Sequence, residues 1–348
     1  MPRRKYVFAL LTMLTAMAGC ARREAAEQPY RETRHVMGTL VAVSIFPPSG
    51  KEARELVSAA FAAMERVDRL MSDYRADSEL SRVNAAAGGE AVPISKELRD
   101  VLVRAAFFSR LTEGAFDPTI RPLVKLWQQC GIENRLPTEN ELDAANALVD
   151  WKAVSVLNWT DVEPAHTARL ARPGMQLDLG GIAKGYAVDH AIATLRALGV
   201  SSALVDAGGD LYALGSHPDG SPWKVGIQDP NREGRILSQT LLLKDRAVAT
   251  SGDYRRFAEI QGKRYSHIID PRTGRPAEHM ASVTVVAANA TDADALSTAF
   301  TVLGPEKSLE LAKELPGMEV MMLVRQDDGK PRVVMSDGFS VFLSDQKK

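Results

Sequence analysis

The chain has 348 residues, and its 43 Lys and Arg residues almost balance its 44 Asp and Glu residues, which gives a formal net charge of −1. Because no basic run follows the N-terminal segment, the charge pattern argues against nucleic acid as a partner. Hydrophobic residues make up 45% of the chain, enough for one large core or for two closely packed domains. With only two cysteines, stability must come from that core rather than from a disulfide framework.

Residues 1–20 have the pattern of an export signal. Arg3, Arg4 and Lys5 form a positive start, an uncharged apolar run follows, and Ala18-Gly19-Cys20 places small residues before a cysteine. This pattern resembles a bacterial lipoprotein signal, in which Cys20 is lipidated and becomes the mature N-terminus. The alternative is a plain secretory signal with an incidental cysteine. The lipoprotein interpretation is favoured, since the apolar run is short for a membrane span.

A polar tether is predicted over residues 21–32, and a single folded unit over residues 33–345. In the first half of that unit, hydrophobic alternation predicts a strand over 36–46, and helical spacing predicts helices over 51–71 and 96–112. Thr138, with Glu141 three residues later, predicts the start of a further helix.

The second half is predicted to contain more strands than helices. A short strand over 175–177 meets a helix over 182–198, and a strand that carries Ser282 feeds a helix that carries Asp294. The remaining predicted strands are 203–205, 211–214, a β-meander over 223–265 that includes 237–243 and 247–250, then 318–324 and 332–335. Strands and helices do not alternate strictly, so the fold class is predicted to be α+β, mixed but largely antiparallel, with flanking helices.

Asp294 and Thr298 are the most informative pair of residues. They are four residues apart in a predicted helix, so a carboxylate and a hydroxyl share one helix face. Two hard oxygen donors of this kind suit Mg²⁺, which completes its shell with water and substrate phosphates. Helix capping is the alternative, with Thr291 as the N-cap, Asp294 in the first turn and Thr298 bonding back to the helix backbone.

A glycine-rich segment over 178–185 joins a predicted strand to a helix. Glycines there let a backbone approach a ligand closely, and free N–H groups at a helix start can receive a phosphate. The spacing matches neither a Walker loop nor a Rossmann fingerprint. Asp178 and Lys184 are either a solvated pair or the holders of a polar ligand, and ordinary turn glycines remain the alternative.

Three further polar positions allow two interpretations each. Asp117, in the loop 114–119, either accepts hydrogen bonds from a heterocycle or caps its own turn. His267 stands at a predicted strand end; a lone histidine is more often structural, yet this one leads into a loop with Asp270. The segment from Asp206 to Asp210 is favoured as a hairpin turn.

Taken in order, eight such segments resemble the ApbE family of FAD:protein FMN transferases, over about residues 33–342. The segments are Met37-Gly38-Thr39, 114–119, 178–185, 206–210, 250–254, 266–271, 273–276 and the pair Asp294 and Thr298. The resemblance implies two interwoven subdomains with the flavin in the cleft between them. It also agrees with the separately predicted lipoprotein signal, because members of this family are commonly exported lipoproteins.

The resemblance implies Mg²⁺-dependent transfer of FMN from FAD to a Thr or Ser hydroxyl of an acceptor flavoprotein, with release of AMP. Asp294, Thr298 and the carbonyl of Gly181 would bind the metal, and His267 is the candidate general base. The implied FAD-binding residues are Met37, Tyr74, Ala115, Phe116, Asp117, Asp178, Lys184, His267 and Ile268. Two other functions stay open: an FAD pyrophosphatase that yields FMN and AMP, and a non-catalytic flavin-binding lipoprotein.

The resemblance also implies a partner and a location. Acceptors are expected among membrane electron-transfer flavoproteins of the Rnf, Nqr or NosR type, which carry a Ser/Thr-Gly-Ala-Thr-like sequence. The nearest match here, Thr250-Ser251-Gly252-Asp253, departs from that sequence, so the chain is not expected to be its own acceptor. The protein is expected on the periplasmic side of the inner membrane, anchored through Cys20.

Overall fold

The computed structural model describes residues 28–158, 166–229, 236–252, 257–326 and 330–344. The targeting segment with Cys20, most of the predicted tether, and Asp253 and Tyr254 of one motif lie outside the described residues. No helix in the described ranges is long and apolar enough to span a bilayer.

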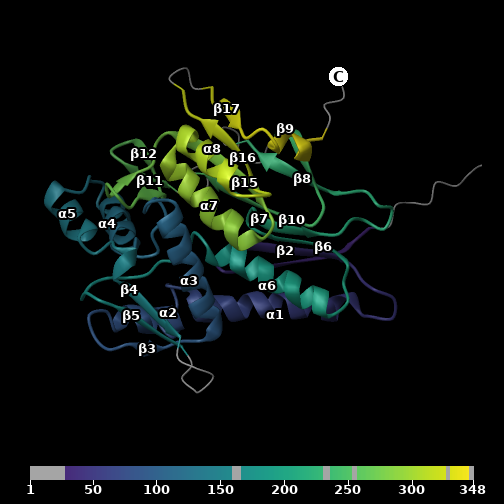
Figure 1. Ribbon diagram of the computed structural model, residues 1–348, viewed down its shortest axis with the longest axis horizontal. Coiled ribbons are helices and arrows are strands. Elements are labelled where there is room, and N and C mark those ends of the chain that lie inside the picture. The colour runs from purple at the N-terminus through teal and green to yellow at the C-terminus, as the bar shows by residue number, and fades with distance from the viewer. Residues whose placement is uncertain (1–27, 159–165, 230–235, 253–256, 327–329, 345–348) are drawn as a thin grey trace, which may run out of the picture.

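An eight-stranded sheet, antiparallel at every pairing, forms the centre of the fold (Figure 1). In spatial order its strands are β1 (Tyr30–Val36), β2 (Thr39–Phe46), β6 (Ser202–Ala207), β7 (Asp210–Leu214), β10 (Arg246–Gly252), β15 (Met280–Ala287), β16 (Glu319–Val324) and β17 (Arg332–Met335). The predicted α+β class with a largely antiparallel sheet is confirmed.

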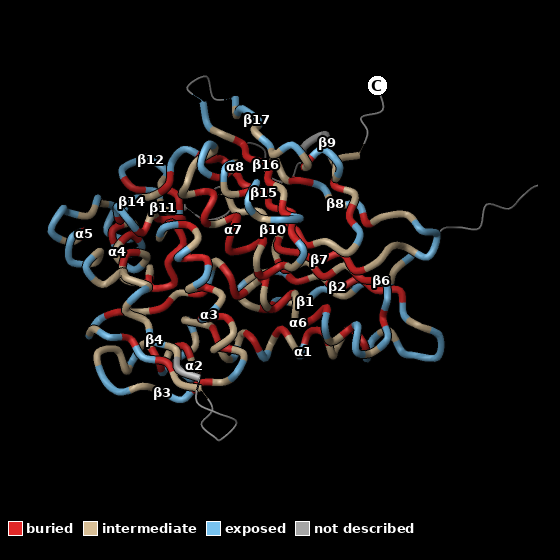
Figure 2. The backbone as a smooth tube through the Cα atoms, in the orientation of Figure 1, coloured by how far each residue is buried: buried red, intermediate tan, exposed pale blue. Residues whose placement is uncertain are grey.

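The two faces of this sheet are covered differently. One face packs against helices α1 (Ala53–Met71), α6 (Ala183–Ala197) and α7 (Ala290–Leu303), with α8 (Pro305–Glu314) beside α7. The other packs against a hairpin of β8 (Trp223–Gln228) and β9 (Ile236–Leu243) and against the 3₁₀ helix η2 (Phe339–Phe342). Figure 2 shows buried stretches concentrated where α6, α7 and the sheet meet.

Alternation along β2 explains which side faces the helices. Val41, Val43 and Ile45 are fully buried against the helical layer, whereas Leu40 is 65% exposed. Burying three β-branched side chains on one face stabilises the strand by roughly 1.5–3 kcal/mol each and fixes its register, since a slip of one residue would expose all three.

A smaller helical part lies beside the sheet. It contains α2 (Glu79–Ala85), α3 (Lys96–Leu111), α4 (Arg121–Ile132), α5 (Glu139–Asn146), η1 (Trp151–Ala153), and a small sheet of β3 (Val92–Pro93), β5 (His166–Leu170) and β4 (Val154–Asn158). Two later hairpins join it: β11 (Phe257–Ile260) with β12 (Lys263–Ser266), and β13 (Ile269–Asp270) with β14 (Arg275–Pro276).

A hydrophobic cluster joins two distant segments of the chain in this part. Trp127 and Leu142 from the α4–α5 region pack with Ile260 and Ile269, which follow more than a hundred residues later. The chain therefore leaves the main sheet, builds the helical part, goes back to the main sheet, and enters the helical part again after β10, as expected for interwoven subdomains.

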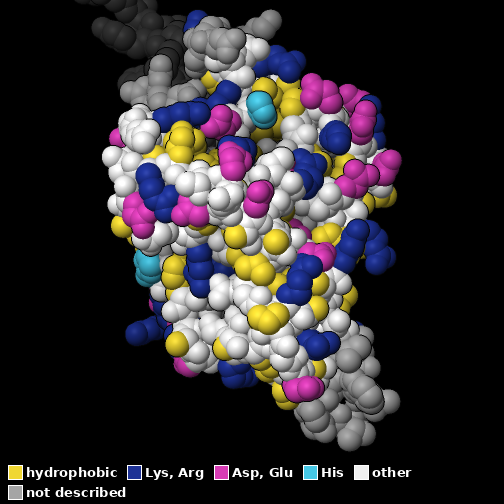
Figure 3. All heavy atoms as spheres, turned by 90° about the vertical axis from the view of Figure 1, so that its left-hand side faces the viewer, with side chains coloured by type: hydrophobic (Ala, Val, Ile, Leu, Met, Phe, Trp, Pro, Cys, Tyr) yellow, Lys and Arg dark blue, Asp and Glu magenta, His cyan; other side chains and the backbone are white. Residues whose placement is uncertain are grey.

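On the face in Figure 3, acidic and basic side chains are interspersed rather than segregated.

The N-terminal strand prediction was incomplete. The predicted strand over 36–46 contains the last residue of β1, then a turn at Met37 (φ +54°) and Gly38 (φ +70°), and then β2, so β1 and β2 form a hairpin. Residues 30–32, which were assigned to the tether, belong to β1. Hydrophobic alternation did not predict this strand, because an edge strand needs little of it and β1 is mostly polar and exposed.

Two other predictions need correction. The β-meander over 223–265 consists of real strands, but they belong to three separate sheets: β8–β9, the main sheet through β10, and β11–β12. Residues 175–177 form no strand; this part of the chain makes only one parallel bridge, between Ile120 and Gln176. Local periodicity does not tell which partner a strand will pair with, because pairing is decided by tertiary packing.

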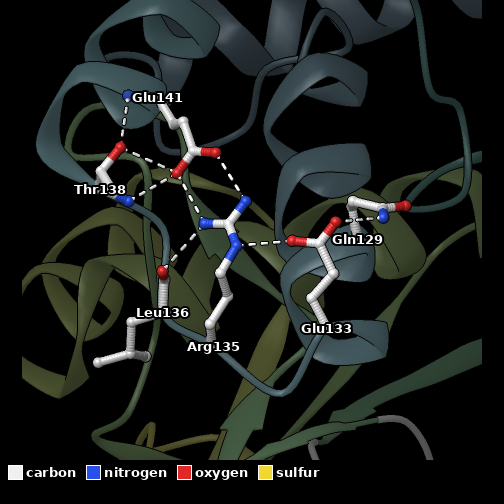
Figure 4. Close-up of polar contacts among 6 residues, drawn as sticks. All are labelled: Gln129, Glu133, Arg135, Leu136, Thr138 and Glu141. Atoms are coloured by element: carbon white, nitrogen blue, oxygen red, sulfur yellow. Dashed lines mark hydrogen bonds and ion pairs between the residues drawn. The ribbon is translucent and has the colours of Figure 1, made fainter.

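The connection between α4 and α5 is fixed by one arginine (Figure 4). Arg135 donates to both oxygens of Glu141, at 2.8 and 2.7 Å, and to Glu133 at 2.6 Å. Glu141 also forms the predicted capping box with Thr138 at the start of α5. These hydrogen bonds, from Arg135 first and Thr138 second, lower the pKa of Glu141 to about 2.

We expect Arg135→Met to lower the free energy of unfolding at neutral pH but not in strong acid. The carboxyl pKa is depressed in the folded state, so its stabilisation is complete above the unfolded value of about 4.5 and is lost as the pH falls toward about 2. Urea unfolding of the variant and the wild type from pH 7 to about pH 2 checks this. Arg169→Met, which removes a bond to a carbonyl (Gly89) instead, should give a pH-independent difference; equal pH dependence for both variants would contradict the assignment.

Candidate active site

A cavity of about 610 Å³ lies where one end of the main sheet meets α6, α7 and the helical part, a size typical of small-molecule sites. Most of the sequence-predicted site residues line it: Tyr74, Ala115, Phe116, Asp117, Asp178, Gly181, Lys184, His267, Ile268, Asp294 and Thr298. Met37 does not. It sits in the β1–β2 turn, two residues before the lining residue Thr39, and its contact with FAD stays a prediction.

Asp294 forms the buried floor of the cavity, 2% exposed. Its carboxylate accepts hydrogen bonds from the Gly185 N–H at 3.0 Å and from Lys184 Nζ at 3.3 Å. The capping alternative for this residue is wrong, because α7 is capped by Asn289, which accepts from the Asp292 N–H at 2.8 Å. Asp294 therefore points at α6 and the cavity rather than at its own helix start.

Glycine at position 185 makes this arrangement possible. A methyl group there would lie 2.1 Å from the Ala290 carbonyl oxygen and 2.9 Å from Asp294 Cβ. Any side chain would push α6 away from α7 and break the hydrogen bond to Asp294. Helix packing therefore accounts for the glycine at position 185, independently of any ligand.

Hard oxygen atoms gather next to Asp294. A methyl group placed on Gly181 would lie 3.1 Å from Thr298 Oγ1, so the loop glycine and the α7 hydroxyl adjoin each other. Ser251 Oγ lies 3.4 Å from Thr298 Oγ1 and 2.8 Å from Ser297 Oγ. In the described part of the chain no three His, Cys, Asp or Glu side chains cluster as a metal site. One carboxylate with a hydroxyl and a nearby carbonyl nevertheless fits Mg²⁺, which takes few protein ligands beside water and phosphate.

Lys184 connects two buried carboxylates, those of Asp294 and Asp210. Burial alone would lower the pKa of the Lys184 ammonium, but the two carboxylates outweigh this and raise it. Burial, together with the charge of Asp294, raises the pKa of Asp210 to about 7 against the opposing effect of Lys184. The interpretation of Asp178 and Lys184 as a solvated pair is wrong, since the partners of Lys184 are Asp210 and Asp294.

Asp210 is a site residue that sequence reasoning missed. It is 3% exposed and begins β7 directly after the Gly208-Gly209 turn, so the hairpin interpretation of 206–210 is correct as far as it goes. One signal could have identified Asp210 as a site residue: it is a carboxylate at the first position of an otherwise fully buried strand. A buried charge needs a partner.

Asp117 caps its own turn, which was one of the two interpretations of this residue. One carboxylate oxygen accepts from the Thr119 N–H and hydroxyl, at 2.8 and 2.6 Å, and the other accepts from the Trp151 N–H at 3.1 Å. Burial raises the pKa of Asp117 although these hydrogen bonds oppose it. Its neighbour Phe116 is 5% exposed and packs edge-on against Phe108, which anchors the loop at the cavity wall.

A second charged cluster on the wall was also missed by sequence reasoning. Arg121, in the first turn of α4, lies 2.7 Å from Asp73 and 3.5 Å from Asp178, and its guanidinium stands 5.5 Å from the centre of the Tyr74 ring. Burial raises the pKa of Asp73, and the negative charge of Asp178 adds to the effect. Only the tertiary structure brings these three residues together, from segments about fifty residues apart.

The mouth of the cavity is formed by His267 and Tyr74. His267 follows the end of β12 and is exposed, whereas its neighbours Ser266 and Ile268 are buried and joined by a 3.1 Å hydrogen bond from the Ile268 N–H to Ser266 Oγ. Tyr74 is 77% exposed. The floor thus carries charge and hard oxygens, and the mouth carries an imidazole and an aromatic ring.

Comparison with known families identifies the chain. The model of the ApbE family matches residues 37–322, which is most of its length. The chain belongs to the ApbE family. Curated relatives named FAD:protein FMN transferase are 38% identical in Treponema pallidum, over 90% of this chain and 89% of that protein, and 34% identical in Escherichia coli, over 97% of each.

Solved ApbE structures have the same fold. The flavin transferase ApbE from Vibrio cholerae superposes with a TM-score of 0.78 at 33% identity, and the ApbE protein from Thermotoga maritima with a TM-score of 0.80 at 32% identity; each match covers 91% of this chain and 100% of the other. As a member of the ApbE family the chain is an enzyme. The matched region, from residue 37 to residue 322, contains the whole cavity lining.

In this ApbE protein, we expect Arg121→Met to reduce stability by roughly 1–3 kcal/mol, because Asp73 and Asp178 would be left partly buried without a counter-charge. Adding Asp73→Asn to that variant should recover part of the loss, since it removes one of the two like charges. Chemical denaturation measures both effects.

Arg275→Met is the matched control, since it breaks an exposed pair with Glu139 and should change stability by less than about 1 kcal/mol. If Arg121→Met were as mild as this control, or if Asp73→Asn made it worse, the charge cluster would not be holding the cavity wall.

Proposed function

We propose that the chain is an FAD:protein FMN transferase, which moves FMN from FAD to a Thr or Ser hydroxyl of an acceptor flavoprotein and releases AMP. The observation that carries this proposal is the floor of the cavity, where Asp294 accepts a hydrogen bond from the Lys184 ammonium and where Thr298 and Gly181, which adjoin each other, line the same space. A site with hard oxygens and a fixed positive charge suits a pyrophosphate and its metal.

Mg²⁺ would be held by the carboxylate of Asp294, the hydroxyl of Thr298 and the carbonyl of Gly181. When bound, the ion would neutralise charge on the pyrophosphate. Lys184 offers a second positive charge at the same place, held there by Asp210. The exposed Tyr74 and the buried Phe116, which both line the cavity, would give FAD apolar contacts.

The proposed reaction is an in-line displacement at the phosphorus of the FMN half. The acceptor oxygen forms a bond to that phosphorus, the bond to the bridging oxygen breaks, and AMP leaves with both electrons of that bond. The hydroxyl proton passes to a base, and the proposal assigns that role to His267, the exposed imidazole at the cavity mouth. Asp294, already bonded to Lys184 and Gly185, acts as a ligand rather than as the base.

We expect Asp294→Asn to abolish transfer and His267→Asn to slow it by about 10²–10⁴-fold while FAD still binds. The full chain in detergent, FAD, Mg²⁺ and an acceptor domain with a Ser/Thr-Gly-Ala-Thr motif would be incubated with and without EDTA. The intact mass of the acceptor reports the added FMN, and flavin fluorescence reports FAD binding. Thr301→Val is the control, because this buried α7 hydroxyl donates back to the Ser297 carbonyl of its own helix and does not line the cavity.

Each outcome separates the candidate functions. A metal-dependent mass gain of one FMN in the wild type and the control, lost in Asp294→Asn, supports the transferase. AMP and free FMN without acceptor labelling would indicate an FAD pyrophosphatase that uses water in place of the acceptor. FAD binding with neither product would indicate a flavin-binding protein, and full activity of Asp294→Asn would exclude the metal assignment.

We further propose that Cys20 is lipidated and anchors the mature protein on the periplasmic side of the inner membrane, close to acceptors of the Rnf, Nqr or NosR type. The support is the charged start, apolar run and small residues before Cys20. Cys20→Ser should move the protein from the membrane fraction to the soluble fraction of a bacterial host and remove the lipid mass from its N-terminus. An unchanged membrane association of the variant would contradict lipid anchoring.

A further inference from the structure

Two buried carboxylates at the floor of the cavity share one ammonium group. Lys184 Nζ donates to Asp210 and to Asp294, and all three side chains line the cavity. Asp210 is the closer partner, whereas Asp294 Oδ1 accepts at 3.3 Å. One ammonium neutralises one carboxylate, so when all three groups are ionised the set keeps one negative charge for a further cation.

The two carboxylates belong to two rigid elements, whereas the ammonium does not. Asp210 begins β7 and is in register with Ala207 of β6. Asp294 lies in α7, and its Oδ2 accepts from the Gly185 N–H at 3.0 Å. Lys184 carries its charge at the end of a flexible four-carbon stem. The ammonium is therefore the part of this set that is able to shift between the carboxylates.

The position of that ammonium decides how well Asp294 can bind a metal ion. One oxygen of Asp294 is taken by the Gly185 N–H, and the other is the one that Lys184 contacts. If the ammonium moved fully onto Asp294, it would occupy that second oxygen and repel a divalent ion beside it. Asp210 attracts the ammonium in the opposite direction, because it is the closer of the two carboxylates.

The β6–β7 turn does not need the Asp210 carboxylate for its own shape. Asp206 already closes this turn, because its carboxylate accepts from the Gly209 N–H at 2.8 Å. Asp206 does not line the active-site cavity, whereas Asp210 does. The Asp210 carboxylate is thus directed at Lys184, and its burial is compensated by that contact.

We propose that Asp210 is a positioning residue, which holds the Lys184 ammonium away from Asp294 and so leaves the Asp294 carboxylate available to Mg²⁺. This inference rests on the metal site of the proposed function. It assigns opposite effects to two residues in contact: in the absence of FAD, Asp210 strengthens metal binding and Lys184 weakens it.

The test measures metal affinity and not transfer. Mn²⁺ is the probe in place of Mg²⁺, and electron paramagnetic resonance counts the free ion. The full chain is used in detergent without FAD at about pH 8, above the pKa of about 7 of Asp210. The variants are Asp210→Asn, Lys184→Met and the double variant. Asp206→Asn is the matched control, since it removes a carboxylate of the same turn, and circular dichroism checks the folding of each variant.

We expect Asp210→Asn to weaken Mn²⁺ binding by about tenfold or more, because the site loses a negative charge and the ammonium moves onto Asp294. Lys184→Met should strengthen Mn²⁺ binding by roughly tenfold, because a like charge is removed. The double variant has the same net charge at the floor as the wild type, so its affinity should return to within about threefold of the wild-type value. Asp206→Asn should stay within about threefold as well, because its charge is farther from the ion and is screened.

Wild-type affinity in Asp210→Asn, or an equal loss in Asp206→Asn, would overturn the positioning role. A double variant as weak as Asp210→Asn would also overturn it, because Asp210 would then act without Lys184. If Lys184→Met loses its folded spectrum, Lys184→Gln, which keeps a hydrogen-bond donor, replaces it in both variants.

Asp294→Asn shows which proposal has failed. Loss of Mn²⁺ binding in this variant supports the metal site on which the comparison depends. Mn²⁺ binding that Asp294→Asn leaves unchanged would overturn the metal assignment of the proposed function and this inference with it. Loss in Asp294→Asn without any loss in Asp210→Asn would overturn the positioning role alone.

Discussion

The site depends on one close contact between two helices, where Gly185 of α6 meets α7 at Ala290 and Asp294. This contact buries the Asp294 carboxylate and leaves it two donors, the Gly185 N–H and the Lys184 ammonium. A buried carboxylate without such donors would be strongly destabilising, and the same donors fix its direction. The floor of the cavity is therefore set before any ligand arrives.

Charge at this floor is balanced by the protein itself. Lys184 stands between Asp294 and Asp210, and burial with the charge of Asp294 raises the pKa of Asp210 to about 7. A second balanced set, Arg121 with Asp73 and Asp178, occupies the wall. Fixed positive groups on two sides, each restrained by carboxylates, form a preorganised environment for a charged substrate, which costs little reorganisation when the substrate binds.

The main sheet separates two environments while joining them at one end. Its helical face carries the ApbE cavity, and its other face carries a second cavity, of about 640 Å³, under the β8–β9 hairpin. The β6–β7 turn is only two residues long, Gly208 and Gly209, and the side chain of Thr39 on β2 packs against Gly208. Thr39, Gly208 and Thr250 line both cavities.

The sequence by itself determined the fold class, the helices around Thr138 and Asp294, and most of the cavity lining, because helical periodicity, caps and local motifs are properties of neighbouring residues. Only the tertiary structure decided that Lys184 pairs with Asp210, that Arg121 bridges Asp73 and Asp178, and that β1 is an edge strand. Those contacts join segments that are tens of residues apart. Their partners are selected by packing and by the need to pair buried charge, and neither leaves a local pattern in the chain.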